Sequence, residues 1–155
     1  MTIASLEKAL PEGDRLLLDT TALAAYLDAT ETTHDLAKYV IDTLVGSGRN
    51  PAIVSMITVM EILVRPLRAT PPGHHTVMAF IRGQPNLSAV SVDLQVAQDA
   101  ASLRAVQRFS PPDALIVGTA FAAQVGHLVT NDRDWARKLA GLESRIRVCT
   151  LSSHL

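Results

Sequence analysis

The sequence predicts an α/β fold, a three-layer α/β/α sandwich around a mostly parallel central sheet. Short apolar runs alternate along the chain with longer stretches of helical periodicity, which is typical of parallel strands joined by helices. Residues 113–125 are apolar nearly all round and rich in small side chains, so we expect a helix lying flat against the sheet. Hydrophobic residues make up 48% and charged residues 19% of the 155 residues, which excludes a disordered chain or a fibrous repeat.

Five short apolar runs are the expected strands. Each is bounded by polar residues or by turn-forming residues, and the first stops at the polar Asp19. The predicted strands are residues 15–19, 51–55, 87–90, 127–130 and 146–148.

Seven stretches have the periodicity of helices, and their ends carry recognisable signals. Thr20 and Thr21 are expected to cap the first. The glycines around Ser47 should end the second, and Pro66 should end the third. Ser110, two prolines and Asp113 open the sixth in the manner of a capping box. The predicted helices are residues 22–27, 33–44, 58–65, 74–81, 92–107, 113–125 and 131–140.

We expect one domain over residues 15–155, preceded by an extension of residues 1–14. The extension is either a helix packed on the surface or a disordered arm. No apolar run is long enough for a membrane span or a signal peptide. The only cysteine, Cys149, cannot form an intrachain disulfide, so we expect a reducing compartment, the cytoplasm. The five histidines lack metal-ligand spacing and are predicted to lie on the surface.

The net charge of −1 hides an asymmetry along the chain. Residues 1–50 carry a net charge of −4, whereas residues 51–155 carry +3. Between Asp42 and Asp93 the only acidic residue is Glu61. The positions of the few late carboxylates are therefore informative.

Four carboxylates are expected at the carboxyl ends of the strands or in the helices that begin at that edge: Asp19, Glu61, Asp113 and Asp132. Ligands bind beyond the carboxyl ends of strands in an open parallel sheet, so the fold would bring these side chains to one edge. A carboxylate cluster repels itself unless a cation neutralises it, and oxygen ligands without histidine or cysteine suit Mg²⁺ or Mn²⁺. Such an ion is suited to phosphodiester hydrolysis.

Each carboxylate alone also fits a structural role. Asp19 and Asp132 suit helix caps, and Asp113 suits a capping box. Glu61 can pair with Arg65 one turn later. Glu61 is the hardest to explain in this way, because it lies in an apolar helical segment where an unpaired carboxylate is costly.

Four segments that contain these carboxylates resemble, in order and spacing, the motifs of the PIN-domain nucleases, and are most similar to VapC-like toxins of toxin–antitoxin pairs. The segments are LLDTTAL (residues 17–23), SMITVMEI (55–62), PDALIVGTA (112–120) and LVTNDRDW (128–135). The resemblance runs from about residue 15 to residue 148. It departs from the family where Trp135 replaces the more usual phenylalanine, and in the length of the N-terminal extension.

The resemblance implies a PIN-like fold and a Mg²⁺- or Mn²⁺-dependent ribonuclease whose acidic quartet matches Asp19, Glu61, Asp113 and Asp132. It also implies an RNA substrate, an antitoxin partner and a homodimer. The supporting positions that it matches are Thr21 and Thr130, with Asp134 as an additional candidate ligand.

Arginine outnumbers lysine eleven to three, and the forked guanidinium group favours contacts with phosphate. Arg65 and Arg133 are the best candidates for RNA-phosphate contacts, because they lie close to the acidic motifs in sequence. The alternative for each is a solvated helix face.

Two other functions compete with the nuclease. A non-catalytic PIN-fold binding module would act through a protein partner and need not bind metal. A phosphatase or receiver-like domain would use Asp19 as a phosphoryl acceptor, but Thr21 stands where the phosphatase pattern has a second acid.

Overall fold

The computed structural model describes residues 2–155 and confirms the α/β sandwich. Its single sheet has the order β3-β2-β1-β4-β5, and every neighbouring pair is parallel. The strands are β1 (Leu16–Leu18), β2 (Ala52–Ser55), β3 (Leu87–Val90), β4 (His127–Thr130) and β5 (Arg147–Thr150).

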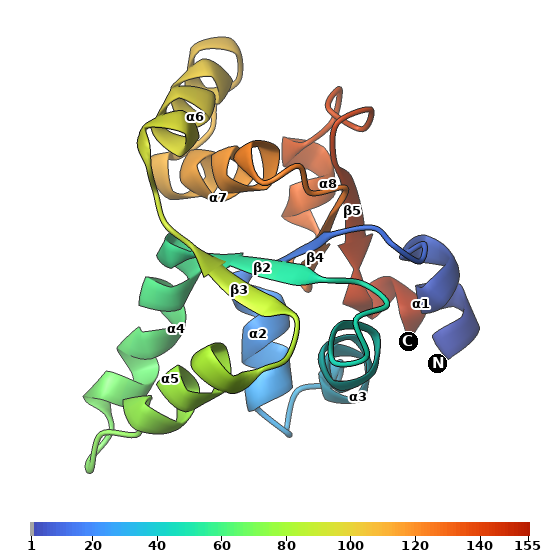
Figure 1. Ribbon diagram of the computed structural model, residues 1–155, viewed down its shortest axis with the longest axis vertical. Coiled ribbons are helices and arrows are strands. Elements are labelled where there is room, and N and C mark those ends of the chain that lie inside the picture. The colour runs from blue at the N-terminus through green and yellow to red at the C-terminus, as the bar shows by residue number, and fades with distance from the viewer. Residues whose placement is uncertain (1) are drawn as a thin grey trace.

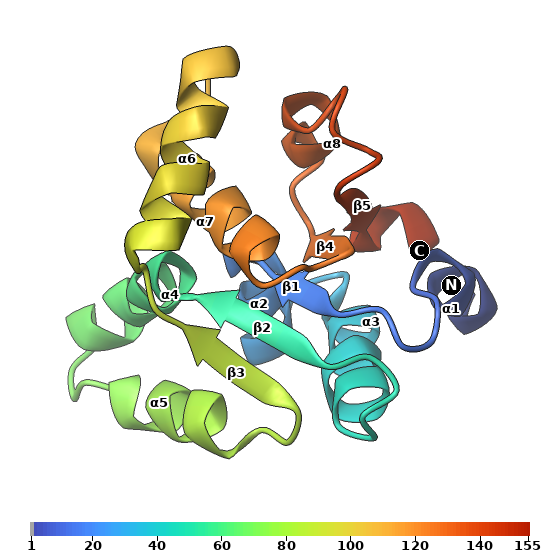
Figure 2. The same ribbon diagram turned by 45° about the horizontal axis from the view of Figure 1, so that its top comes forward.

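Helices cover both faces of the sheet (Figures 1 and 2). One face carries α6 (Leu94–Val106), α7 (Pro111–Ala122) and α8 (Asp134–Lys138). The other carries α2 (Thr20–Leu27), α3 (His34–Lys38), the π-helical η1 (Tyr39–Val45), α4 (Met56–Arg68) and α5 (His74–Gly83).

Successive side chains of the buried strands alternate between two hydrophobic cores, one beneath each helical layer. In β1, Leu17 packs into the core beneath α7, whereas Leu16 and Leu18 pack into the core on the opposite face. All three leucines are fully buried. Because successive side chains point to opposite faces of a strand, an all-leucine strand serves both layers.

Several helix boundaries differ from the expectation. Asp19, not Thr20 or Thr21, caps α2, since its side chain accepts a hydrogen bond from the Ala22 backbone N–H at 3.0 Å. Pro66 does not end α4, which continues to Arg68. A proline in the last turn removes only one of the backbone hydrogen bonds, and the helix ends soon afterwards.

Two further helices differ from their predicted ranges in type or in length. The helix expected over residues 33–44 begins as α3 and continues as η1, and α8 is shorter than the range 131–140. The turn before α8 is held by Asp132, whose side chain accepts a hydrogen bond from the Asp134 backbone N–H at 2.9 Å.

The N-terminal extension contains α1 (Ile3–Ala9), a helix packed on the C-terminal turn η2 (Leu151–His154). Leu6 and Leu10 are fully buried and join the core beside α3. The division between an extension and a domain that starts at residue 15 stays a prediction. Within residues 2–155, the helices are too short or too polar for any of them to cross a membrane.

His127 is buried, contrary to the expected surface position. Its Nδ1 lies 3.1 Å from the Asp14 carboxylate. Burial lowers the pKa of the ring below its ordinary value of 6.5, and the positive charge of Arg147 adds to this, although Asp14 opposes it.

We therefore expect the free energy of unfolding to decrease as the pH falls below 6.5, because the unfolded state then binds more protons than the folded state. His127→Asn should weaken this pH dependence without removing it, since burial also lowers the pKa of His154. Urea titrations at several pH values provide the measurement, with the exposed His75→Asn as control. An unchanged slope in His127→Asn would contradict the prediction.

Candidate functional site

Asp19 lies at the end of β1, with only 3% of its surface exposed. Its Oδ1 accepts hydrogen bonds from the Ala22 backbone N–H at 3.0 Å and from the Thr21 hydroxyl at 2.9 Å. Burial raises the pKa of this carboxyl, and the hydrogen bonds it accepts reduce that rise. The surrounding donors thus offset part of the cost of placing a negative charge inside the protein.

The two predicted hydroxyl positions connect Asp19 to the fourth acidic motif. The Thr130 hydroxyl donates to Asp19 Oδ2 at 2.7 Å and accepts from the Asp132 backbone N–H at 2.9 Å. Thr21 accepts a hydrogen bond from the Asn131 backbone N–H at 2.8 Å. The ends of β1 and β4 are therefore joined through side chains as well as through the sheet.

Trp135 is a residue of the candidate site that the sequence marks only as a departure from the family's more usual phenylalanine. Its indole Nε1 donates a hydrogen bond to Asp19 Oδ2 at 2.9 Å. The side chain is 3% exposed and packs in the core beneath α7. The signal in the sequence was the indole N–H itself, since a buried tryptophan needs a hydrogen-bond acceptor and phenylalanine does not.

We expect Trp135→Phe to lower the free energy of unfolding by about 2 kcal/mol, because it removes a buried hydrogen bond to a carboxylate. In an Asp19→Ala background the same change should cost less, since the acceptor is already gone. Urea denaturation of the four proteins measures this coupling. Equal costs in both backgrounds would assign the whole effect to packing.

Asp113 and Asp132 converge on one cation, the ammonium group of Lys138. The Lys138 Nζ lies 2.9 Å from Asp113 Oδ2 and 4.0 Å from Asp132 Oδ2. It also lies 4.8 Å from the centre of the Trp135 ring. Ser110 caps α7 through the Asp113 backbone N–H at 3.4 Å, which leaves the carboxylate of Asp113 to face the lysine.

Glu61 reaches the start of α2 from α4. Its Oε2 accepts a hydrogen bond from the hydroxyl of Thr20, the residue next to Asp19. It does not pair with Arg65, whose Nη1 lies 3.5 Å from the Asp28 carboxylate and whose side chain is 90% exposed. A structural pairing within α4 therefore does not explain this carboxylate.

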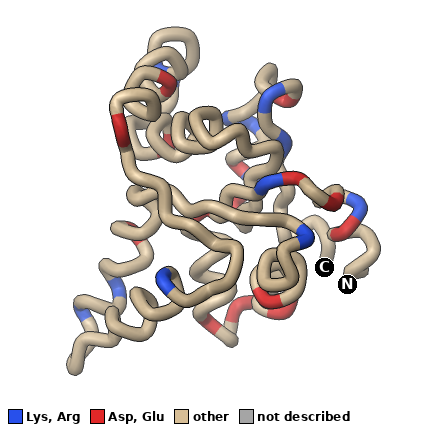
Figure 3. Tube along the Cα trace, in the orientation of Figure 1, with Lys and Arg blue, Asp and Glu red and all other residues tan. Residues whose placement is uncertain are grey.

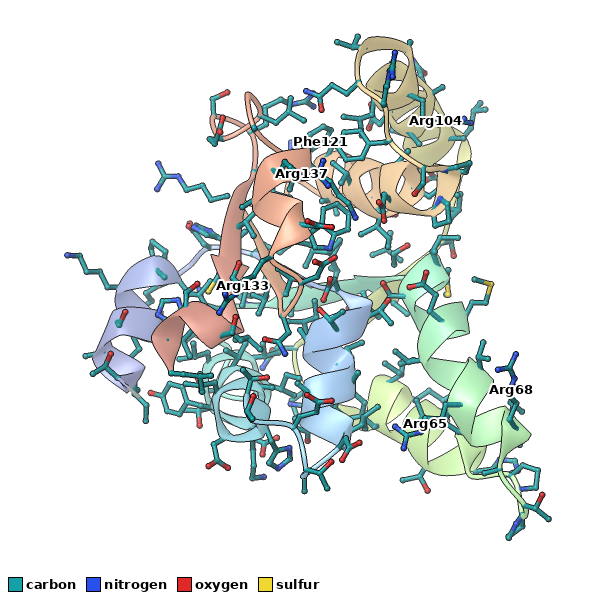
Figure 4. The ribbon with its side chains drawn as sticks, turned by 180° about the vertical axis from the view of Figure 1, so that it is seen from behind. Arg65, Arg68, Arg104, Phe121, Arg133 and Arg137 are labelled. Atoms are coloured by element: carbon teal, nitrogen blue, oxygen red, sulfur yellow. The ribbon has the colours of Figure 1, made fainter. Side chains whose placement is uncertain are left out.

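The remaining candidate residues, Asp134, Arg65 and Arg133, lie outside the group of carboxylates around Asp19. Asp134 faces Arg137 at 3.6 Å, and its side chain is 62% exposed. Arg133 donates from Nε to the Ser152 hydroxyl at 3.3 Å. Figure 4 shows Arg65 on α4 and Arg133 beside the C-terminal turn, and their polar partners are Asp28 and Ser152, neither of which is a candidate metal ligand.

The donor set suits a hard divalent cation. Carboxylate and hydroxyl oxygens surround the end of β1, and a positive group already lies between Asp113 and Asp132. As the side chains stand in residues 2–155, no three acidic, histidine or cysteine side chains are close enough together to hold one ion. Asp19, Asp113 and Asp132, with Glu61 close by, stay the predicted ligands, and Lys138 would have to leave the two outer carboxylates before an ion could bind them.

Comparison with known proteins places this arrangement in a family. The profile of the PIN domain matches residues 16–141. Comparison with curated protein sequences gives no match.

Solved structures with the same fold include several toxins. A toxin–antitoxin complex from Klebsiella pneumoniae has 23% identity and a TM-score of 0.64, and the match covers 88% of this chain and 97% of that one. DNA-bound VapBC from Salmonella typhimurium has 22% identity and a TM-score of 0.64, with 88% and 98% covered. The sarcin-ricin loop cleaving toxin VapC20 of Mycobacterium tuberculosis has 17% identity and a TM-score of 0.62, with 79% and 93% covered.

The profile match spans most of the chain, and the sheet, the helical layers and the four acidic motifs all lie within or beside it. The chain belongs to the PIN-domain family.

Proposed function

We propose that this protein is a Mg²⁺- or Mn²⁺-dependent endoribonuclease that hydrolyses RNA phosphodiester bonds as the toxin of a toxin–antitoxin pair. The observation that supports this best is the convergence of Asp113 and Asp132 on a positive charge, beside the buried Asp19, in a PIN-domain protein. Carboxylates that gather at the carboxyl edge of a parallel sheet suit metal-assisted hydrolysis.

Each residue has a distinct role in this proposal. Asp19, Asp113 and Asp132 hold the ion, which when bound lowers the pKa of water and neutralises charge on a phosphodiester oxygen. Thr21, Thr130 and Trp135 keep the Asp19 carboxylate in one orientation.

Glu61 lies apart from the three carboxylates that hold the ion, and it orients or deprotonates the attacking water from the α4 side. Asp134 is an additional candidate ligand at the edge of the site. Arg65 and Arg133, both exposed, are left as candidates for contacts with more distant phosphates of the RNA.

The test is hydrolysis of a mixed pool of cellular RNA by the purified protein. We expect cleavage with added Mn²⁺ and none with excess EDTA, because the carboxylates alone supply no electrophile for the phosphodiester. If no RNA is cleaved under any metal condition, the non-catalytic binding module becomes the better function.

The partner proposal rests on α4 as well as on the relatives, which include toxin–antitoxin complexes. Met60, Val64 and Leu67 of α4 are 56%, 41% and 52% exposed. We propose that an antitoxin covers this apolar face and that the toxin forms a homodimer. We also propose that both proteins act in the cytoplasm, a reducing compartment in which Cys149 stays unpaired. Sedimentation of the protein alone and with the product of a neighbouring gene would test the first two points.

A further inference from the structure

A cavity of about 390 Å³ lies next to the carboxylate site, between α8 and the segment that joins α6 to α7. Its lining combines three cationic side chains, a polar one and two apolar ones: Arg108, Arg137, Lys138, Gln107, Phe109 and Ala140. No acidic side chain lines it. A concave site with this charge is complementary to an anion.

Basic residues outnumber acidic ones in the neighbouring segment 133–147, which has five Lys or Arg residues and two acidic ones, Asp134 and Glu143. Figure 3 shows Lys and Arg gathered on α8 and the loop that follows it. Figure 4 shows Arg137 near the helix pair α6 and α7, in agreement with its place in the cavity lining. Its one carboxylate neighbour, Asp134, is 3.6 Å away and solvent-exposed, and such a pair is weak. Within residues 2–155, no carboxylate lies within 4.0 Å of a nitrogen of Arg108.

Lys138 contacts both the cavity and the carboxylate site. It lines the cavity, and its Nζ lies 2.9 Å from Asp113 Oδ2. It is also the only lysine after residue 38, and every other basic residue in that part of the chain is an arginine. A flexible four-carbon stem lets an ammonium group move between two partners, which a planar guanidinium does less readily.

We propose that the cavity is a subsite for a phosphate group of the RNA strand, and that Lys138 is its mobile cation. In the protein without metal, Lys138 neutralises Asp113 and Asp132. With a divalent cation bound by those carboxylates, the ammonium group would be free to turn toward the cavity and join Arg108 and Arg137 on the phosphate. This inference rests on the proposed function, because the cavity receives a phosphate only if a nucleic-acid strand, here the proposed RNA substrate, lies across the carboxylates.

The first arm of the test measures binding of a fluorescein-labelled single-stranded RNA by anisotropy, in EDTA so that no metal-dependent cleavage occurs. Arg108→Gln and Arg137→Gln should each weaken binding about tenfold, as expected for loss of a charge-assisted contact. Each should also reduce the slope of log K against log salt by about 0.7. Arg82→Gln on α5 is the matched control and should bind like the wild type. Wild-type affinity and salt slope in both cavity variants would overturn the subsite.

The second arm measures Mn²⁺ binding by isothermal titration calorimetry in the absence of RNA. Lys138→Met should bind Mn²⁺ about tenfold more tightly than the wild type, because the competing cation is gone. Arg137→Gln removes the same charge from the same helix but leaves Asp113 paired, so it controls for net charge. Equal affinities in Lys138→Met and Arg137→Gln would overturn the exchange of partners by Lys138.

Neither arm depends on turnover. RNA that binds through the cavity arginines but is never hydrolysed would leave the subsite standing and refute the nuclease. If the wild-type protein hydrolyses RNA while Arg108→Gln and Arg137→Gln bind RNA as tightly as the wild type, the nuclease stands and the subsite is refuted. Circular dichroism of each variant establishes that it is folded.

Discussion

Asp19→Asn is expected to lower the rate of RNA hydrolysis by about a hundredfold or more, which is the size of effect that follows from losing several kcal/mol of metal-based stabilisation. The amide keeps the volume of the carboxylate but removes the charge. Both carboxylate oxygens already accept a backbone or indole N–H, from Ala22 and from Trp135. Either orientation of the amide therefore places its NH₂ group against a donor.

The measurement is the initial rate of RNA cleavage with Mn²⁺. Asp35→Asn serves as the matched control, because Asp35 is an exposed acid in the first turn of α3. Mn²⁺ affinity can be followed in parallel through the fluorescence of Trp135, the only tryptophan, which is hydrogen-bonded to Asp19. An Asp19→Asn variant that cleaves RNA at the wild-type rate would refute the catalytic role of this carboxylate.

Gly118→Val is expected to lower the free energy of unfolding by about 3 kcal/mol, because α6 and α7 cross too closely for a side chain at this position. A Cβ atom on Gly118 would lie 2.9 Å from the Val96 carbonyl oxygen and 3.0 Å from the Ala100 backbone nitrogen. Both neighbours are backbone atoms, so a rotamer change cannot relieve the clash. The two helices would have to separate.

Urea denaturation gives the required free energies. Gly83→Ala, near the end of α5, is the control, because a Cβ there meets nothing within 4 Å. Alanine should be neutral or stabilising by up to about 1 kcal/mol at that position. A Gly118→Val protein as stable as the wild type would show that α6 and α7 can shift apart without cost.

The local patterns in the sequence were sufficient for the sheet. The ranges predicted for residues 87–90 and 127–130 coincide with β3 and β4, because short apolar runs bounded by turn residues have few other ways to bury themselves. Boundaries were less predictable wherever a distant group decides them. Asp19 is a good helix cap from sequence alone, but the hydroxyl partners that hold it belong to Thr21 and Thr130, the latter more than a hundred residues away.

The same limit applies to the candidate site. Three of the four carboxylates, Glu61, Asp113 and Asp132, stand out in the sequence because acidic residues are scarce after residue 50, and Asp19 stands out because it ends a predicted strand. Their roles as a metal-binding set stay a prediction. Trp135 and Lys138 were not recognised, because their significance depends on contacts with Asp19 and Asp113 that no local pattern contains.

The sequence by itself therefore determined the alternation of strands and helices and the parallel sheet, since these follow from hydrophobic periodicity. The four acidic motifs were visible through the positions of their carboxylates and through the resemblance to the PIN-domain nucleases. Only the tertiary structure decided which partner each polar group takes. It paired Arg65 with Asp28 and not with Glu61, buried His127 beside Asp14, and placed the ammonium of Lys138 between two carboxylates and a basic cavity. Such pairings depend on distances between residues far apart along the chain, and packing of the whole chain sets those distances.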